Sequence, residues 1–179
     1  NLDSIKIGIA DNAATDNSTY MLEKIINKSK LDIELFSYQE NHYYWSAAKK
    51  VIKKLKNIIG TYPDWIIVCN NDITFSNNNF FKKLAKINMK EYPIIGPNIV
   101  NSYGKKLNPF LVSPQSMLQS LYWNFYFTSY PISVILRTIK KLFTLFILRG
   151  KKVEPNINQA VYAIHGSAIL FSNHFFNKG

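Results

Sequence analysis

The sequence predicts an α/β domain with a mainly parallel sheet flanked by helices. Short apolar runs alternate with segments of helical periodicity between residues 5 and 97, as in consecutive βαβ units. The run Trp65 to Cys69 is apolar throughout, which is typical of a strand buried on both faces. With 179 residues, of which 47% are hydrophobic, the chain can bury the core of one domain, and we assign residues 1–179 to it.

The elements of this domain follow one another closely. The apolar run Ile5 to Ala10 predicts a strand, and the turn and cap residues 11–18 predict a loop after it. Further strands are expected at 33–36, 65–69 and 92–97, and helices after the cap at Ser18 or Thr19, at 44–59 and at 79–88. In the 44–59 helix the lysines form a basic face, for which we expect a solvated, structural role.

Residues 116–152 interrupt this alternation with an inserted aromatic and basic helical segment. Two apolar stretches, 118–130 and 132–148, are separated by Pro131, and Arg137, Lys140 and Lys141 share one face of the second. A length of about 17 residues with three cations near the middle argues against a helix that spans a bilayer. Two alternatives stay open: an interfacial helix on an anionic membrane, with Trp123 and Tyr122 or Tyr126 as anchors, or a hairpin packed on the sheet or on another subunit.

Charge and cysteine content limit the partners and the cellular compartment that fit this chain. The net charge is +11, and no acidic residue occurs between Glu91 and Glu154, so this stretch should attract anionic lipid, nucleotide phosphate or nucleic acid. The single cysteine, Cys69, excludes an internal disulfide framework and is expected to be a packed core thiol. The first residues carry no secretory signal, and a reducing cytoplasm fits.

Three polar segments are predicted at strand ends: residues 11–16, residues 70–72, and His165 to Ser167 at a break between short strands at 160–164 and 168–171. Ligands of open α/β sheets bind beyond the carboxyl ends of the strands, so these loops could converge on one ligand. For Asp72 a turn or helix-cap role is the alternative, and for His165 a satisfied buried imidazole.

Five segments together resemble the family 2 glycosyltransferases of the Rossmann-related GT-A fold. They are residues 7–18, similar to the family's D-N-x-S-T-D-x-S loop, residues 40–48, similar to its N-x-x-x-W-x-G-G segment, residues 65–74, residues 94–97 and residues 164–171. Their order agrees with the family over most of the chain, except for residues 108–155. The resemblance implies a GT-A-like domain and an inverting sugar transfer from a nucleotide-sugar donor.

The resemblance also implies roles for individual residues. Asp11 would hydrogen-bond the base of the donor, and the other donor-binding residues would be Asn12, Asp16, Trp45 and Asn71. Asp72 would bind Mg²⁺ or Mn²⁺ on the donor diphosphate, a role that suits a hard cation with oxygen ligands. Asn71 stands where the family has its first carboxylate. On the acceptor side the residues would be His165, Gly166 and Ser167.

Two expected parts of the family pattern are missing. The acidic segment that supplies the general base follows the last strand in relatives, so we expect the base beyond Gly179 and name no catalytic residue. The strand and helix that precede Ile5 in relatives are absent as well. The sequence therefore resembles a family member truncated at both ends, and the fragment could be inactive.

The resulting prediction is a cytoplasmic enzyme, peripheral on the inner face of the membrane, that glycosylates a glycan or lipid-linked acceptor in bacterial surface polysaccharide synthesis. The anionic membrane surface is an expected partner, nucleic acid is disfavoured, and an oligomer is left open. One alternative is a sugar nucleotidyltransferase, against which the sequence shows no early Gly-rich phosphate loop with a nearby cation. The other is a non-enzymatic basic domain that binds nucleic acid or membrane, for which charge and aromatics are the evidence.

Overall fold

The computed structural model describes residues 4–77, 79–147 and 159–178, with backbone alone for residues 140 and 142–147. The chain divides into two compact units, and each is described by itself. The first comprises residues 1–97 and 166–179, and the second comprises residues 98–165.

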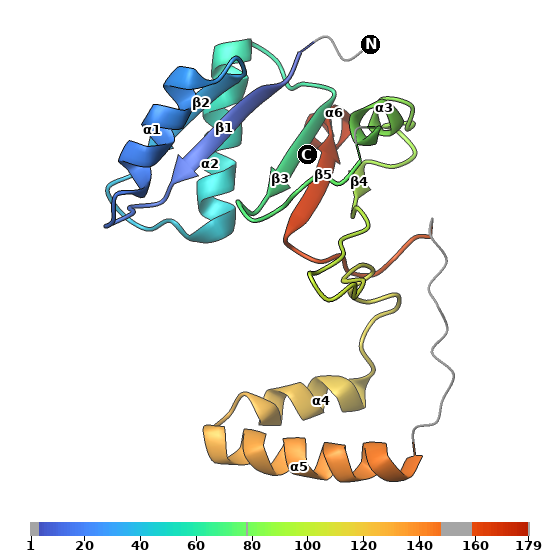
Figure 1. Cartoon of the computed structure of the whole chain (residues 1–179). Helices are drawn as coiled ribbons and strands as arrows, with labels where there is room; N and C mark the ends of the chain where they lie inside the picture. The colour runs from blue at the N-terminus through green and yellow to red at the C-terminus, as the bar shows by residue number, and fades with distance from the viewer. Residues whose placement is uncertain (1–3, 78, 148–158, 179) are drawn as a thin grey trace. The chain divides into compact units, whose positions relative to one another are not determined.

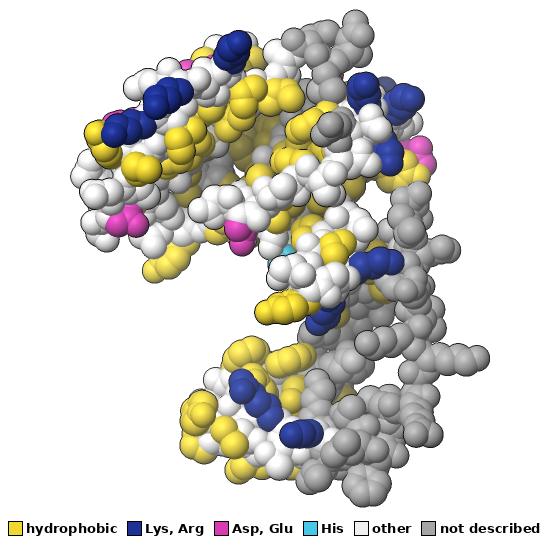
Figure 2. All heavy atoms as spheres, in the orientation of Figure 1, with side chains coloured by type: hydrophobic (Ala, Val, Ile, Leu, Met, Phe, Trp, Pro, Cys, Tyr) yellow, Lys and Arg dark blue, Asp and Glu magenta, His cyan; other side chains and the backbone are white. Residues whose placement is uncertain are grey.

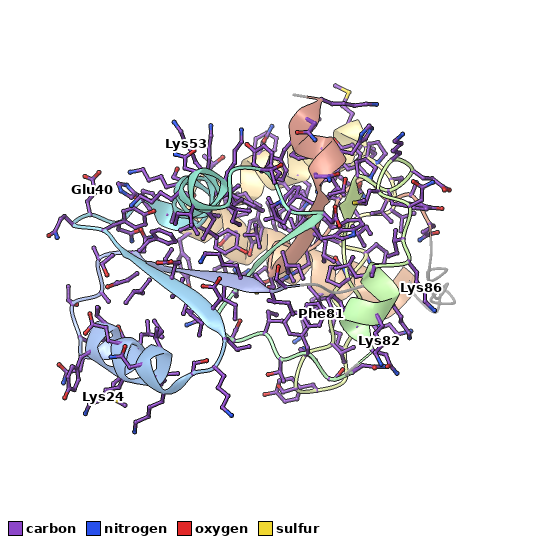
Figure 3. All side chains as sticks on the ribbon, turned by 90° about the horizontal axis from the view of Figure 1, so that it is seen from above. Lys24, Glu40, Lys53, Phe81, Lys82 and Lys86 are labelled. Atoms are coloured by element: carbon purple, nitrogen blue, oxygen red, sulfur yellow. The ribbon has the colours of Figure 1, made fainter. Side chains whose placement is uncertain are left out.

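The first unit begins with the predicted βαβ arrangement. Strand β1 (Lys6–Asp11) pairs in parallel with β2 (Asp32–Ser37), in a register that runs from Lys6 opposite Asp32 to Asp11 opposite Ser37. Helix α1 (Ser18–Lys28) connects them, and α2 (Tyr43–Ile59) follows β2. The two helices lie on opposite faces of the strand pair, as Figures 1 and 3 show. The parallel pair therefore has a helix on each face, as expected for βαβ units.

Helix α2 packs closely on β1 because of one glycine. A Cβ atom added to Gly8 would lie 2.6 Å from Val51 Cγ1 and 2.7 Å from Leu55 Cδ1, so no larger residue fits there without movement. The helix ends at Gly60, which has the left-handed backbone (φ 86°) of a helix C-terminus. Lys53 points outward from α2 (Figure 3), so the predicted solvated position is confirmed for this lysine.

The second sheet of this unit has the order β3–β5–β4, formed by β3 (Trp65–Cys69), β5 (Ala168–Ser172) and β4 (Ile94–Ile95). The central strand β5 runs antiparallel to both neighbours, so the prediction of a mainly parallel sheet is wrong for this part of the molecule. An apolar run is typical of any strand covered on both faces, and the run alone does not determine strand direction. The α/β class itself is confirmed.

The core of the first unit lies around β5. Ala168, Ile169 and Leu170 are buried there, as is Val68 on β3. Helices α3 (Phe80–Leu84) and α6 (Asn173–Asn177) are both short, and α3 covers half of the predicted 79–88 helix. Cys69, the last residue of β3, is exposed, which corrects the prediction of a packed core thiol. Partial desolvation nevertheless raises the pKa of its thiol.

The second unit contains the helices α4 (Met117–Tyr126) and α5 (Tyr130–Ile147), which pack side by side (Figure 1). The predicted 116–152 segment is thus helical over 117–147 within the described residues, and residues 148–152 lie outside them. Ser116 caps α4 in a capping box with Gln119, and Pro131 occupies the first turn of α5, where a missing N–H costs nothing.

The strand predicted at 160–164 is wrong, because the described part of this segment forms a single bridge between Ala163 and Leu111. Among the described helices, none combines the length and the apolar character needed to cross a membrane.

Candidate functional site

Asp11 organises the loop after β1. Its side chain is 8% exposed. The Thr19 hydroxyl donates to Oδ2 (2.6 Å) and the Ala14 N–H donates to Oδ1 (3.0 Å). These two hydrogen bonds, that from Thr19 above all, hold the pKa of Asp11 below its ordinary value. The residue predicted to bind the donor base therefore already has one partner on each oxygen, and it determines the shape of the loop from within.

Asn12 joins this loop to the one that follows β2. Its Oδ1 accepts the His42 N–H (2.7 Å) and its Nδ2 donates to Asn41 Oδ1 (2.7 Å). The Asn41 side chain also accepts the N–H of Tyr43, the first residue of α2. Asn12, which was predicted to bind the donor, thus braces one loop against the other just before α2 begins.

Asp16 lies at the far end of the β1 loop and is exposed. Its Oδ1 accepts the Ser18 N–H (3.0 Å) at the start of α1. Hydrogen bonds from Ser18 lower the pKa of this carboxyl. Because Asp16 is exposed, its carboxylate stays accessible to a ligand while it supports the start of α1.

The first turn of α2 connects the β1 loop to the second sheet. Trp45 is half exposed, and its ring lies edge-on to Tyr44 (5.0 Å between centroids) and to Phe171 of β5 (6.4 Å). Tyr44 interacts electrostatically with Cys69 at the end of β3, and burial is the main cause of its raised pKa. Trp45, predicted on the donor side, therefore stands between the two sheets of the first unit.

The second polar segment is a turn directly after β3, which meets the start of β5. The Asn70 N–H donates to the Ser167 carbonyl (2.9 Å), and Asn71 and Asp72 form the exposed turn that follows. Two of the three predicted polar segments, residues 70–72 and Ser167, are thus brought together by antiparallel pairing.

His165 belongs to the second unit, where Asn108 holds its backbone. The His165 N–H donates to Asn108 Oδ1 (2.6 Å), and the imidazole is half-buried, edge-on to Phe110 at 6.3 Å between centroids. Gly166 is exposed, and a Cβ atom built there would meet nothing within 4 Å. The fold itself therefore does not require glycine at 166.

Asp72 is the predicted metal ligand, and it is an exposed carboxylate in the turn after β3. Within the described part of the chain, no group of three or more His, Cys, Asp or Glu is arranged to hold a metal ion. Mg²⁺, however, is commonly held by one or two carboxylates, with substrate phosphates and water as the other ligands. Exposed Asp72, at the end of β3, meets that requirement as a single protein ligand.

Comparison with known proteins adds no family to this description. No family model, curated protein or solved structure matches the chain.

Several residues of this region were not among the predicted site residues. Thr19 holds Asp11, Asn41 receives Asn12, and Asn108 positions His165. Asn41 lies within the segment 40–48, and Thr19 directly follows the segment 7–18. Their proximity to these motifs could have indicated that they belong to the site. Asn108 lies 57 residues before His165, and nothing in the sequence pattern links the two.

Proposed function

We propose that the chain is a glycosyltransferase domain of GT-A type that binds a nucleotide-diphosphate sugar and transfers the sugar to a glycan or lipid-linked acceptor. The main support is a continuous series of contacts along one part of the first unit. It runs from Asp11 and Asn12 to the first turn of α2, where Tyr44 interacts with Cys69, the residue just before the Asn70–Ser167 pair. Carboxylates, amides and an exposed aromatic ring along one edge are the groups that recognise a nucleotide and its diphosphate.

The proposed roles differ with exposure. The β1 loop, braced by Asp11 and Asn12, presents its backbone and Asp16 to the nucleoside. Half-exposed Trp45 offers a ring face for the base or sugar, and Asn71 offers an amide for a ribose hydroxyl. Gly166 leaves space for close approach of the acceptor or the transferred sugar, beside His165 and Ser167.

Asp72 would hold Mg²⁺ or Mn²⁺ on the donor diphosphate. When bound, the cation would stabilise the negative charge that develops on the leaving nucleoside diphosphate. In the transfer, an acceptor oxygen forms the new bond to the anomeric carbon, the bond to the diphosphate oxygen breaks, and the hydroxyl proton goes to a base. We assign that base to no described residue.

The proposed setting is the cytoplasmic side of a bacterial membrane, in surface polysaccharide synthesis. This part of the proposal is supported by the family resemblance of the five segments and by the charge of the chain. A lipid-linked acceptor would explain why a positively charged domain carries an aromatic helical insertion.

Titration of UDP and dTDP with and without Mn²⁺ tests the donor site directly. We expect the Mn²⁺-dependent gain in affinity to fall at least about tenfold in Asp72→Ala. The matched control is Asp64→Ala, because Asp64 is an exposed carboxylate just before β3, at its opposite end. Metal-dependent binding that survives Asp72→Ala would remove Asp72 from the site. Salt-dependent DNA binding without affinity for either nucleotide would favour the nucleic-acid alternative.

A further inference from the structure

Helix α4 carries an apolar stripe that faces solvent. Met117, Leu118, Leu121 and Phe125 are 79, 79, 41 and 59% exposed. They occur at i, i+1, i+4 and i+8, so they share one face of the helix. We call these four residues the α4 stripe. Its spacing is that of a helix that buries one face against another surface.

The α4 stripe is separate from the aromatic cluster of the same helix. Tyr122, Trp123 and Tyr126 are half-buried and in mutual ring contact along α4, and Arg137 of α5 donates to the Tyr126 hydroxyl. The rings predicted as membrane anchors thus pack against one another, and Tyr126 also links α4 to α5. Exposed aromatic side chains are found instead at Phe125 on the stripe and at Phe127 and Tyr130 near the α4–α5 turn.

The unit that carries the α4 stripe has a strongly positive composition. Residues 98–165 contain eight Lys and Arg and one Glu, a net charge of +7 out of the +11 of the whole chain. On α5, Arg137 and Lys141 are exposed and one helical turn apart. Figure 2 shows Lys and Arg side chains beside apolar ones on one face of this helix pair. An exposed apolar stripe beside cations is the pattern of a helix at an anionic lipid interface.

We propose that the α4 stripe, with Arg137 and Lys141 of α5, docks the protein on an anionic lipid bilayer. The apolar side chains enter the boundary between headgroups and acyl chains, and the cations bind lipid phosphates. Charge complementarity favours this partner over a second copy, since two surfaces of the same positive unit repel each other. It also favours lipid over nucleic acid, because an apolar stripe adds nothing to phosphate contacts.

This inference deepens the proposed function. Its biological role rests on that function, because the surface would bring the transferase to a lipid-linked acceptor. Docking itself is measured without a nucleotide, and nucleotide binding is measured without lipid. A chain that binds liposomes but no nucleotide would refute the transferase proposal alone, and the reverse result would refute docking alone.

The experiment is cosedimentation of the full chain with liposomes of phosphatidylcholine alone or with about 30% phosphatidylglycerol. We expect binding to the anionic liposomes, and a fall on the order of tenfold in affinity for the double variant Leu118→Ser with Phe125→Ser. The control is Met21→Ser with Ile25→Ser, a pair on α1 that is 55 and 59% exposed. It should leave binding within about twofold of wild type.

A charge variant keeps the test independent of any misfolding of α4. Lys141→Glu should lower binding to anionic liposomes on the order of tenfold, whereas Lys30→Glu, with the same net charge, should change it about twofold at most. Unchanged binding of the folded stripe variant, or equal binding to neutral and anionic liposomes, would overturn the proposal. Self-association or RNA binding that depends on the α4 stripe, without liposome binding, would overturn it in favour of those partners.

Discussion

Replacing Asp11 by alanine and by asparagine separates its two roles, as a brace of the β1 loop and as the predicted contact to the donor base. The substitution leaves the Thr19 hydroxyl and the Ala14 N–H without their acceptors, 2.6 and 3.0 Å away in the native loop. A buried donor left without a partner costs about 1–3 kcal/mol. Ala14 is exposed and Thr19 is half-buried, so water can reach both. The lower end of the range, about 1 kcal/mol, applies to each of the two donors, so Asp11→Ala should cost about 2 kcal/mol of unfolding free energy in total.

Asparagine is the informative companion of this substitution. Its Oδ1 can still accept from the Ala14 N–H, and its amide can donate to a rotated Thr19 hydroxyl. The lost quantity is mainly the charge assistance of the two hydrogen bonds, about 1 kcal/mol in total. The pKa of Asp11 is lowered in the folded state, so its ionised form stabilises the fold at neutral pH. This contribution begins to fall below about pH 4 and is lost as the pH falls through the lowered pKa of the folded state, so the stability gap between wild type and Asp11→Asn should narrow below pH 4.

Urea unfolding followed by tryptophan fluorescence, at pH 7 and at pH 3.5, measures both effects. Nucleotide titration of the folded Asp11→Asn variant then reports on the donor contact without the complication of unfolding. Stability of Asp11→Ala within about 0.5 kcal/mol of wild type would refute the reasoning, since surface substitutions typically fall within that range. So would a stability gap of Asp11→Asn that does not change with pH.

Three further substitutions test the packing around the site and the insertion. Gly8→Ala should lower the unfolding free energy by about 1–2 kcal/mol in a urea titration, because the added Cβ would meet the stiff side chain of Val51 at 2.6 Å. Gly166→Ala should leave it within about 0.5 kcal/mol, since the added Cβ meets open space, and a larger loss would contradict that geometry. Ser116→Ala should cost about 1 kcal/mol by removing the capping box with Gln119, and thermal melting by far-UV circular dichroism checks it; an unchanged melting temperature would count against the cap.

Elements with a strong periodic or apolar signal could be predicted from the sequence. The apolar run at Trp65–Cys69 matches β3 at both ends, and α2 begins one residue before its predicted start and ends at Ile59 as predicted. Gly60 supplies the left-handed residue that stops this helix. Pro131 also indicated correctly that two helices are present here, because proline is tolerated in the first turn of a helix and not in its middle.

The elements that depend on distant partners were harder to predict. The direction of β5 depends on how the chain returns from residues 98–165, which no local pattern encodes. Residues 160–164 have the composition of a strand but find one bridge partner, Leu111. The exposure of Cys69 is a similar case, since an apolar run indicates that a strand is covered and does not say where the cover ends.

The polar segments at residues 70–72 and at Ser167 illustrate how two segments can be predicted to meet for an incorrect reason. Their convergence was expected from the carboxyl ends of parallel strands. In the structure β5 is antiparallel to β3, and the start of an antiparallel strand lies at the same edge as the end of its neighbour. A polar segment before β5 and one after β3 therefore meet, as the bond from Asn70 to Ser167 shows. The prediction placed Ser167 after a strand at 160–164 that does not form, and Ser167 reaches the same edge because it directly precedes β5.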